Sequence, residues 1–318
     1  MSTQSESTST TNTLKERWEP RIERFKRGWS RYTHHKMGVI GLFILVVYVL
    51  WALFPSVFAP HNPSWRLFVG NDPYARLTLQ QSQQFPHPPA FGDPAFIPFG
   101  TNGKGQGVFT LLVYAAKDAL YIGFAAGILS SLVGVPLGLI SGFYGNTWID
   151  ETIQRIVDVM YGMPFLPFLI VLVSIRGVSQ TNIILGIAIT SWLNNCILIR
   201  GETLSLKERA YVESARVAGA SDTRIVFRHI LPNVIPLAFV FLAQDAAGAI
   251  IAQASLAYLG LGDFTNNSWG IMIQNIKSES YVFEAPWWLI PPGLAITSIA
   301  AAFYFIGFSV EDLANPQE

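Results

Sequence analysis

Long apolar stretches are the feature that most limits what this chain can fold into. A helix needs about 20 apolar residues to cross the hydrocarbon core of a bilayer, and a helix in lipid satisfies its own backbone hydrogen bonds. Six stretches approach or exceed that length, at about 38–58, 119–143, 156–175, 183–199, 234–261 and 287–308. The sequence therefore predicts an all-α, polytopic membrane protein with six transmembrane helices.

The scarcity of charge supports this interpretation. Hydrophobic residues make up 51% of the chain and charged residues only 13%, against about 25% charged in soluble domains. The formal net charge is zero, which argues against a nucleic-acid partner because such partners need a basic surface. Cys196 is the only cysteine, so no disulfide can form within the chain.

Lysine and arginine positions predict the topology, because cytoplasmic loops carry an excess of them. Eight lie between residues 15 and 36 and six between 200 and 228, whereas residues 59–117 hold four and the connection after residue 261 holds one. This asymmetry favours two cytoplasmic termini: a disordered and basic segment 1–37 before the first helix at 38–58, and a tail 312–318. A signal peptide is the alternative for the first apolar stretch. Residues 59–117 then lie outside, before a five-helix core at 118–311.

Glycines at four-residue spacing mark the second stretch. Gly134, Gly138 and Gly142 share one helix face, where another backbone can approach closely. We interpret this stripe as a packing surface within the chain.

The polar segment at about 202–233 predicts a helix, a tight turn and a second helix. Good helix formers fill 207–218, and Gly219 suits the left-handed residue that ends a helix. Ser221 can cap a second helix that runs to Leu231, where Pro232 would stop it. The alternatives are a structural αα-hairpin and a DNA-reading helix–turn–helix, although no recognition helix is free between two membrane spans.

Several motifs in order resemble one family. Glu213-Ser-Ala-x-x-x-Gly219 followed by Leu231-Pro232 resembles the EAA loop of ABC importer permeases, and residues 217–236 are similar to the C-type subunits of dipeptide and oligopeptide permeases. The stretches 99–107, 143–150, 254–262, 268–270 and 286–296 are also similar to that family. The resemblance extends over most of residues 38–316.

The resemblance implies a type I ABC importer permease fold and a multi-pass protein of a prokaryotic plasma (inner) membrane that imports dipeptides or oligopeptides. Its expected partners are a second permease subunit in a heterodimer, two cytoplasmic ATPase subunits that bind ATP and Mg²⁺, an extracytoplasmic solute-binding protein and membrane lipid. The chain itself has no phosphate-binding G-x-x-x-x-G-K-[ST] motif, so ATP must be bound by other subunits. No cofactor, catalytic residue or metal site is expected in this chain. The residues that the EAA motif would place against the ATPase are Glu213, Ser214, Ala215, Ala218, Gly219, Ala220 and Asp222.

Some positions depart from the family pattern. Ser214 replaces an alanine, Asn102, Gln106 and Gly107 replace Asp, Arg and Asp, and Gln253 stands where Glu is usual. These departures leave the exact substrate open, so another small solute such as a chelated metal is an alternative cargo.

Polar residues within the apolar stretches predict a translocation path. Asp245 lies mid-span, where an acid is costly and usually faces the bundle interior or water. Asn194, Asn195 and Gln253 are the other candidates, and hydrogen bonding between helices is the alternative role for all four.

An intramembrane aspartyl protease and an ion channel are two further functional classes. Residues 260–263 match the G-x-G-D of intramembrane aspartyl proteases, whose chemistry needs a second carboxylate nearby. Asp158 is the candidate partner, but the predicted topology places it near the cytoplasmic side and Asp263 near the outer side. An ion channel is the other class, and no stretch resembles a selectivity filter.

Overall fold

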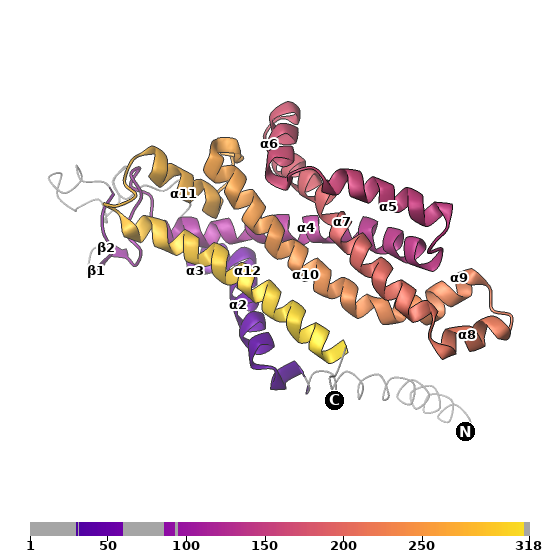
Figure 1. Cartoon of the computed structure of the whole chain (residues 1–318). Helices are drawn as coiled ribbons and strands as arrows, with labels where there is room; N and C mark the ends of the chain where they lie inside the picture. Colours follow the sequence, from indigo (N-terminus) through magenta and orange to yellow (C-terminus); the bar gives the residue numbers. More distant parts are fainter. Residues whose placement is uncertain (1–29, 31, 60–85, 93–94, 315–318) are drawn as a thin grey trace, which may run out of the picture.

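A computed structural model describes residues 30, 32–59, 86–92 and 95–314, which form an elongated bundle of helices (Figure 1). In this part of the chain, five helical segments are long and apolar enough to cross a membrane. They are α2 (Lys36–Leu53), α4 (Val108–Phe143), α7 (Gln180–Lys207), a run at Asp222–Leu261 that contains α9 (Asp222–Ile225) and α10 (Leu231–Leu256), and α12 (Pro286–Ala314). The predicted helical, multi-span fold is confirmed.

The third predicted span differs from a single straight helix. Residues 156–175 belong to two helices, α5 (Trp148–Tyr161) and α6 (Phe165–Arg176), which meet at an angle of 84°. Pro164 lies at the bend with an extended backbone, and proline cannot donate the hydrogen bond that would continue the helix. α6 has 12 residues, or about 18 Å at 1.5 Å per residue, so it is too short to cross a bilayer alone.

The segment predicted to lie outside has some regular secondary structure. Its described part contains a two-stranded antiparallel hairpin of β1 (Ala90–Gly92) and β2 (Ala95–Ile97), in register with Phe91 opposite Phe96. The first span, α2, ends at Leu53, and the short helix α3 (Pro55–Phe58) follows it. Residues 60–85 and most of the basic segment 1–37 lie outside the described residues.

The glycine stripe of α4 packs against α7, as predicted. A Cβ added to Gly134 would lie 2.6 Å from the Trp192 carbonyl oxygen, and one added to Gly138 would lie 2.7 Å from that of Cys196. A Cβ added to Gly142 would lie 2.7 Å from the carbonyl oxygen of Arg200. These distances leave no room for a side chain, so the backbones of α4 and α7 are in direct contact.

The end of the bundle near the hairpin is held by buried tryptophan. Ser268 caps α11 (Trp269–Ser278) by accepting a hydrogen bond from the Ile271 N–H. The next residue, Trp269, is 2% exposed and donates its indole N–H to the Leu112 carbonyl at 3.0 Å. Gly270 follows. A Cβ added to it would lie 2.7 Å from the Ala254 Cα, so the space holds only a hydrogen atom. The Ser-Trp-Gly motif is therefore explained by packing of α11 onto α4 and α10.

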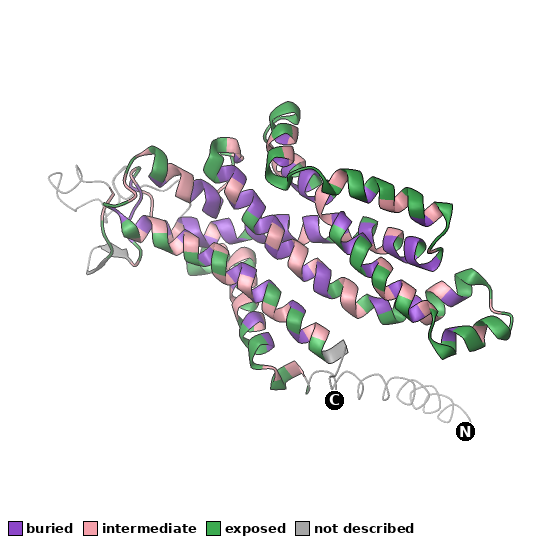
Figure 2. Ribbon diagram, viewed as in Figure 1, coloured by how far each residue is buried: buried purple, intermediate pink, exposed green. Residues whose placement is uncertain are grey.

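The hairpin and α11 lie at one end of the bundle, and α9 lies with α8 (Ala210–Val217) at the other (Figure 1). Buried residues concentrate along α4, whereas α5, α6 and α8 are exposed over much of their surface (Figure 2). The elbow of α5 and α6 thus stands at the side of a core built around α4.

Replacing Gly138 with leucine should disrupt the fold, because the new side chain meets the α7 backbone. Overpacking of this kind costs about 1–3 kcal/mol, so we expect a lower unfolding temperature of the purified protein in detergent, measured by intrinsic fluorescence. Gly201→Ala is the matched control, since a Cβ there meets nothing within 4 Å. Equal unfolding temperatures for Gly138→Leu and the control would contradict the proposed backbone contact.

Candidate functional site

The loop between α7 and α10 has the predicted left-handed glycine. Gly219 has φ +82°, and α8 ends at Val217. The Gly219 N–H donates to the Arg216 carbonyl at 3.0 Å, and the Ala220 N–H donates to the Ala215 carbonyl at 3.0 Å. This is the pair of bonds of a Schellman ending, so Gly219 reverses the chain between α8 and α9.

The second helix of the loop does not stop at proline. Ser221 caps α9 by accepting from the Arg224 N–H, as predicted, but the chain then continues through a π-helical turn, Val226–Ile230, into α10. The Leu231 N–H donates to the Val226 carbonyl five residues earlier. We attribute the continuity to this wide turn, which relieves the clash that Pro232 would cause in a regular helix. The prediction that Pro232 ends the helix was wrong.

Buried apolar side chains anchor the loop to the bundle. Val212 of α8, Ile225 of α9 and Ile230 of the π-helical turn are each 0% exposed. They belong to one cluster with Leu206 of α7 and Phe143 of α4. Because both loop helices share this core, the loop is joined firmly to the ends of α4 and α7.

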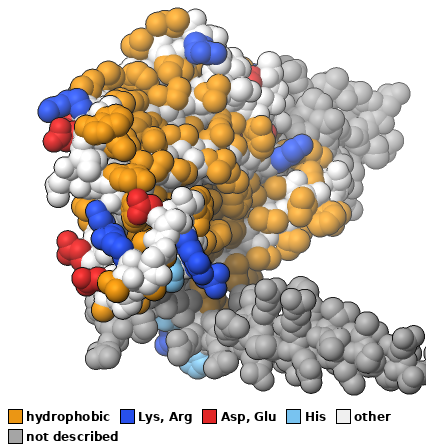
Figure 3. Space-filling view, turned by 90° about the vertical axis from the view of Figure 1, so that its right-hand side faces the viewer, with side chains coloured by type: hydrophobic (Ala, Val, Ile, Leu, Met, Phe, Trp, Pro, Cys, Tyr) orange, Lys and Arg blue, Asp and Glu red, His pale blue; other side chains and the backbone are white. Residues whose placement is uncertain are grey.

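The residues assigned to ATPase coupling mostly face away from this anchor. Ala215 and Ala220 are half-buried, and the other members of the set are exposed: Glu213, Ser214, Ala218, Gly219 and Asp222. Val217 beside them is an apolar side chain that is 85% exposed. Figure 3 views the end that carries α8 and α9, where acidic and basic side chains lie among apolar ones. The loop therefore presents a small, partly apolar surface.

A cavity of about 620 Å³ lies between the α5–α6 elbow, α7 and α10. Its polar lining includes three of the four residues predicted for the translocation path, namely Asn194, Asn195 and Asp245. Its apolar lining includes Met160, Met163, Phe165, Leu193, Leu198, Phe241 and Tyr304. The volume falls within the range of about 300–1,000 Å³ that small-molecule sites occupy.

Hydrogen bonds fix the polar lining of this cavity. The Asn195 side-chain N–H₂ donates to an Asp245 carboxylate oxygen at 2.7 Å, and the Tyr161 hydroxyl donates to the Asn194 side-chain oxygen at 2.9 Å. Among the described residues, the bond from Asn195 is the only side-chain hydrogen bond to Asp245. The carboxylate therefore keeps acceptor capacity that faces the cavity.

Gln253 lies elsewhere. It is 6% exposed and lines a separate cavity of about 10 Å³ with Asp118, Gln180 and Asp263. Two helical turns along α10 separate it from Asp245, so the structure groups three of the predicted path residues and leaves this one apart.

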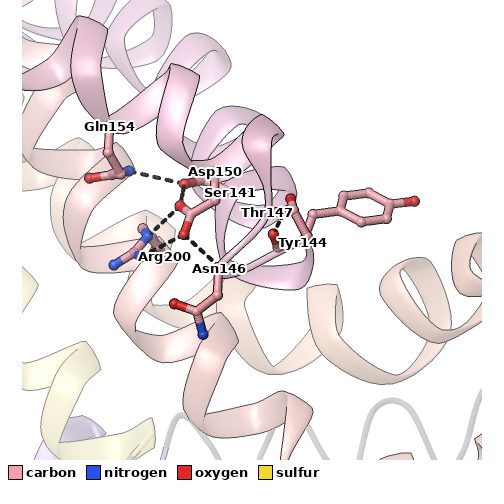
Figure 4. A network of polar contacts seen from close by, with 7 residues as sticks. All are labelled: Ser141, Tyr144, Asn146, Thr147, Asp150, Gln154 and Arg200. Atoms are coloured by element: carbon pink, nitrogen blue, oxygen red, sulfur yellow. Dashed lines mark hydrogen bonds and ion pairs between the residues drawn. The ribbon is translucent and has the colours of Figure 1, made fainter.

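A network of polar contacts near the α8 end joins three helices (Figure 4). Asp150 of α5 is 3% exposed, and its two carboxylate oxygens accept bonds from Arg200 Nε and Nη2 of α7, both at 2.7 Å. The Ser141 hydroxyl of α4 donates to Asp150 at 2.5 Å, and the Asn146 N–H donates at 3.1 Å. Gln154 of α5 donates to the Ser141 oxygen at 3.0 Å. The carboxylate is thus fully hydrogen-bonded.

Reasoning from the sequence missed this pair. In the sequence Arg200 contributes only to the topology argument, and Asp150 only ends the 143–150 stretch. An acidic and a basic residue 50 positions apart show no sequence periodicity that would indicate their contact. The available sign was that both are charged residues at the edges of apolar stretches, where a charge needs a partner.

The geometry does not support the pairing of Asp263 with Asp158 that the aspartyl protease alternative predicts; the acid that lines the same small cavity as Asp263 is Asp118. The Asp263 carboxylate accepts from the Thr265 hydroxyl at 2.5 Å, the Thr265 N–H at 3.1 Å and the Asn266 side chain at 3.1 Å. Asp158 is exposed on α5. Asp263 therefore stabilises a turn after α10, and its motif is explained by that role.

Comparison with known proteins places these features in a family. Residues 134–317 match the family of binding-protein-dependent transport system inner membrane components, and residues 23–86 match the N-terminal transmembrane domain of oligopeptide transport permease C. A solved methionine ABC transporter in an inward-facing conformation has a similar fold, with a TM-score of 0.51 and 16% identity over 64% of this chain and 94% of that one.

Curated relatives extend the likeness over nearly the whole chain. A dipeptide transport system permease protein of Alkalihalophilus pseudofirmus is 31% identical over 93% of this chain and 91% of its own length. An oligopeptide transport system permease protein of Bacillus subtilis is 30% identical over 92% and 90%, and a glutathione transport system permease protein of Pectobacterium atrosepticum is 35% identical over 69% and 72%. The chain therefore belongs to the family of binding-protein-dependent transport system inner membrane components, the permease subunits of bacterial ABC transporters.

Proposed function

We propose that this chain is a permease subunit of an ATP-driven importer of short peptides. The observation that carries the proposal is the cavity beside α7 and α10, where Asp245 keeps unused acceptor capacity. The relatives described above are named for dipeptide, oligopeptide and glutathione transport, and all three cargoes are peptides. In this family ATP hydrolysis belongs to separate subunits.

The chemistry of the cavity suits peptides. A carboxylate in a membrane interior is costly unless it serves a purpose, and Asp245 can balance the charged amino terminus that every unmodified peptide has. Exposed Asn194 supplies an amide group for the peptide backbone, and buried Asn195 orients the Asp245 carboxylate. Met160 and Met163 are flexible apolar side chains, which adapt to varied side chains of a cargo.

The loop at 202–233 is proposed to couple the permease to an ATPase subunit. Its exposed surface around Ala215, Ala218 and Gly219 is small enough for a close contact, and Val217 adds exposed apolar area. Its buried side, held by Val212, moves with the bundle. Movement of the ATPase subunits would then shift the helices as rigid bodies between inward- and outward-open states.

The full proposed assembly contains this chain, a second permease subunit, two ATPase subunits that carry ATP and Mg²⁺, and an outer solute-binding protein. Both termini and the coupling loop lie in the cytoplasm, while the hairpin and α11 face outward. The distribution of lysine and arginine supports this orientation.

The coupling proposal is tested by Gly219→Arg. Gly219 has positive φ, and an added arginine brings strain, volume and charge to the proposed contact. We expect complexes that insert and fold but lose peptide-stimulated ATP hydrolysis and peptide uptake. Gly260→Arg is the matched control, because Gly260 is exposed with φ +88° and open surroundings but lies after α10, at the other end of the bundle. Full stimulation and uptake in Gly219→Arg would overturn the coupling assignment.

Asp245→Asn tests the path. The variant keeps the shape and the contact with Asn195 but removes the charge, and one hydrogen bond to a charged group is worth about 1.5–3 kcal/mol. We expect uptake of labelled peptide, normalised to assembled complex, to fall roughly tenfold or more. Asp158→Asn, on the exposed side of α5, should transport normally. Wild-type uptake by Asp245→Asn would reduce that residue to a packing role.

Orientation is checked by single cysteines at Ser205 and Ser280 in a Cys196→Ala background. Both serines are exposed, on opposite ends of the bundle. An impermeant thiol reagent applied to spheroplasts should label position 280 and leave position 205 unlabelled until the membrane is opened. The reverse pattern would invert the topology.

A further inference from the structure

α5 is fastened to α7 at both of its ends. In its first turn Asp150 holds Arg200 with two bonds of 2.7 Å, and its last residue, Tyr161, bonds to Asn194. Between these points Val157 is 1% exposed and packs in a cluster with Cys196. Ile153 and Met160 are partly buried against the same cluster, and most of the rest of α5 is exposed (Figure 2), so these contacts and those with α4 hold it in place.

The network at the first turn also includes α4. Ser141 of α4 bonds to the same carboxylate, one residue before Gly142 meets the α7 backbone. Asn146 adopts a left-handed backbone with φ +62°, which turns its N–H toward Asp150. The corner between α4 and α5 is therefore shaped around this carboxylate (Figure 4).

The position of the network connects two sites. In one direction α7 runs from Arg200 to Lys207 and then into α8 of the loop. In the other direction α5 runs from Asp150 to Met160 and Tyr161, which line the cavity. A displacement of the loop therefore reaches this wall of the cavity only while α5 moves together with α7.

We propose that Asp150 and Arg200 are positioning residues that clamp α5 to α7 and α4, so that the α5 wall of the cavity moves as one body with the coupling loop. This inference rests on the proposed transport function. A bidentate arginine–carboxylate pair suits the task because it fixes orientation as well as distance. The fully bonded carboxylate also adds rigidity to the corner.

A purely stabilising pair would give the same picture, so the variants must separate the two roles. Asp150→Asn alone leaves Arg200 without its charged partner and lowers the yield of folded protein under either role. The double variant Asp150→Asn/Arg200→Met removes both charges, and removing a whole buried pair is often tolerated. Glu151→Gln, an exposed acid on the same turn of α5, is the matched control.

The experiment measures directly whether α5 keeps its position relative to α7. Spin labels at Arg155 of α5 and Ser205 of α7, both exposed, are introduced with Cys196→Ala into the assembled complex. Pulsed electron paramagnetic resonance then gives the distance between the labels without nucleotide and with ATP bound. The same preparations, unlabelled, give peptide uptake per ATP hydrolysed.

With native Asp150 and Arg200, and in Glu151→Gln, we expect one narrow distance that is the same in both nucleotide states. The double variant should assemble, show a broad or state-dependent distance, and lose roughly 2- to 30-fold in uptake per ATP, the range for removing one coupling contact. A narrow, unchanged distance or normal uptake per ATP in the double variant would overturn the inference. The distance between the labels is measured without peptide, so it tests the clamp independently of the cargo. A failure of the proposed function would appear separately, as normal coupling in Gly219→Arg.

Discussion

Close contact of the α4 backbone with its neighbours sets the positions of the other helices. Helices in lipid gain little from hiding apolar side chains from each other, so small residues that allow dispersion contacts take over. Gly134, Gly138 and Gly142 meet α7, while Gly127 lies on another face of α4, 2.8 Å from the Leu242 carbonyl of α10 if a Cβ is added. α4 is thus the central, largely buried helix (Figure 2). The cavity lies beside α7 and α10, the two helices that pack against it.

Asp150 and Asp245, two acids near α4, have opposite hydrogen-bonding environments. Asp150 receives four hydrogen bonds, from α4, from α7 and from the turn between α4 and α5, and a network satisfied to that degree rigidifies what it joins. Asp245 receives one side-chain bond and borders a cavity. This contrast separates a structural joint from a site with capacity for a ligand, and it underlies the roles proposed for them.

Several stretches that carry the family resemblance have structural explanations at the hairpin end of the bundle. Asn102, where the family has Asp, accepts the backbone N–H groups of Lys104 and Gln106 at 3.0 and 2.9 Å. An aspartate would accept the same two bonds, so this departure preserves a turn. Asp263 likewise closes a turn, and Trp269 fills the core. These positions therefore say little about the cargo, which leaves the cavity lining as the better guide.

The sequence alone determined the helical membrane fold, the glycine stripe and the left-handed Gly219, because bilayer thickness, helical periodicity and the steric limits on positive φ act locally. It also supplied the family resemblance. Only the tertiary structure decided the 84° elbow at Pro164 and the continuous helix through Pro232, since whether proline breaks or bends a helix depends on the surrounding contacts. The pairing of Asp150 with Arg200 was likewise decided by folding, because contacts between distant segments leave no periodic trace in the sequence.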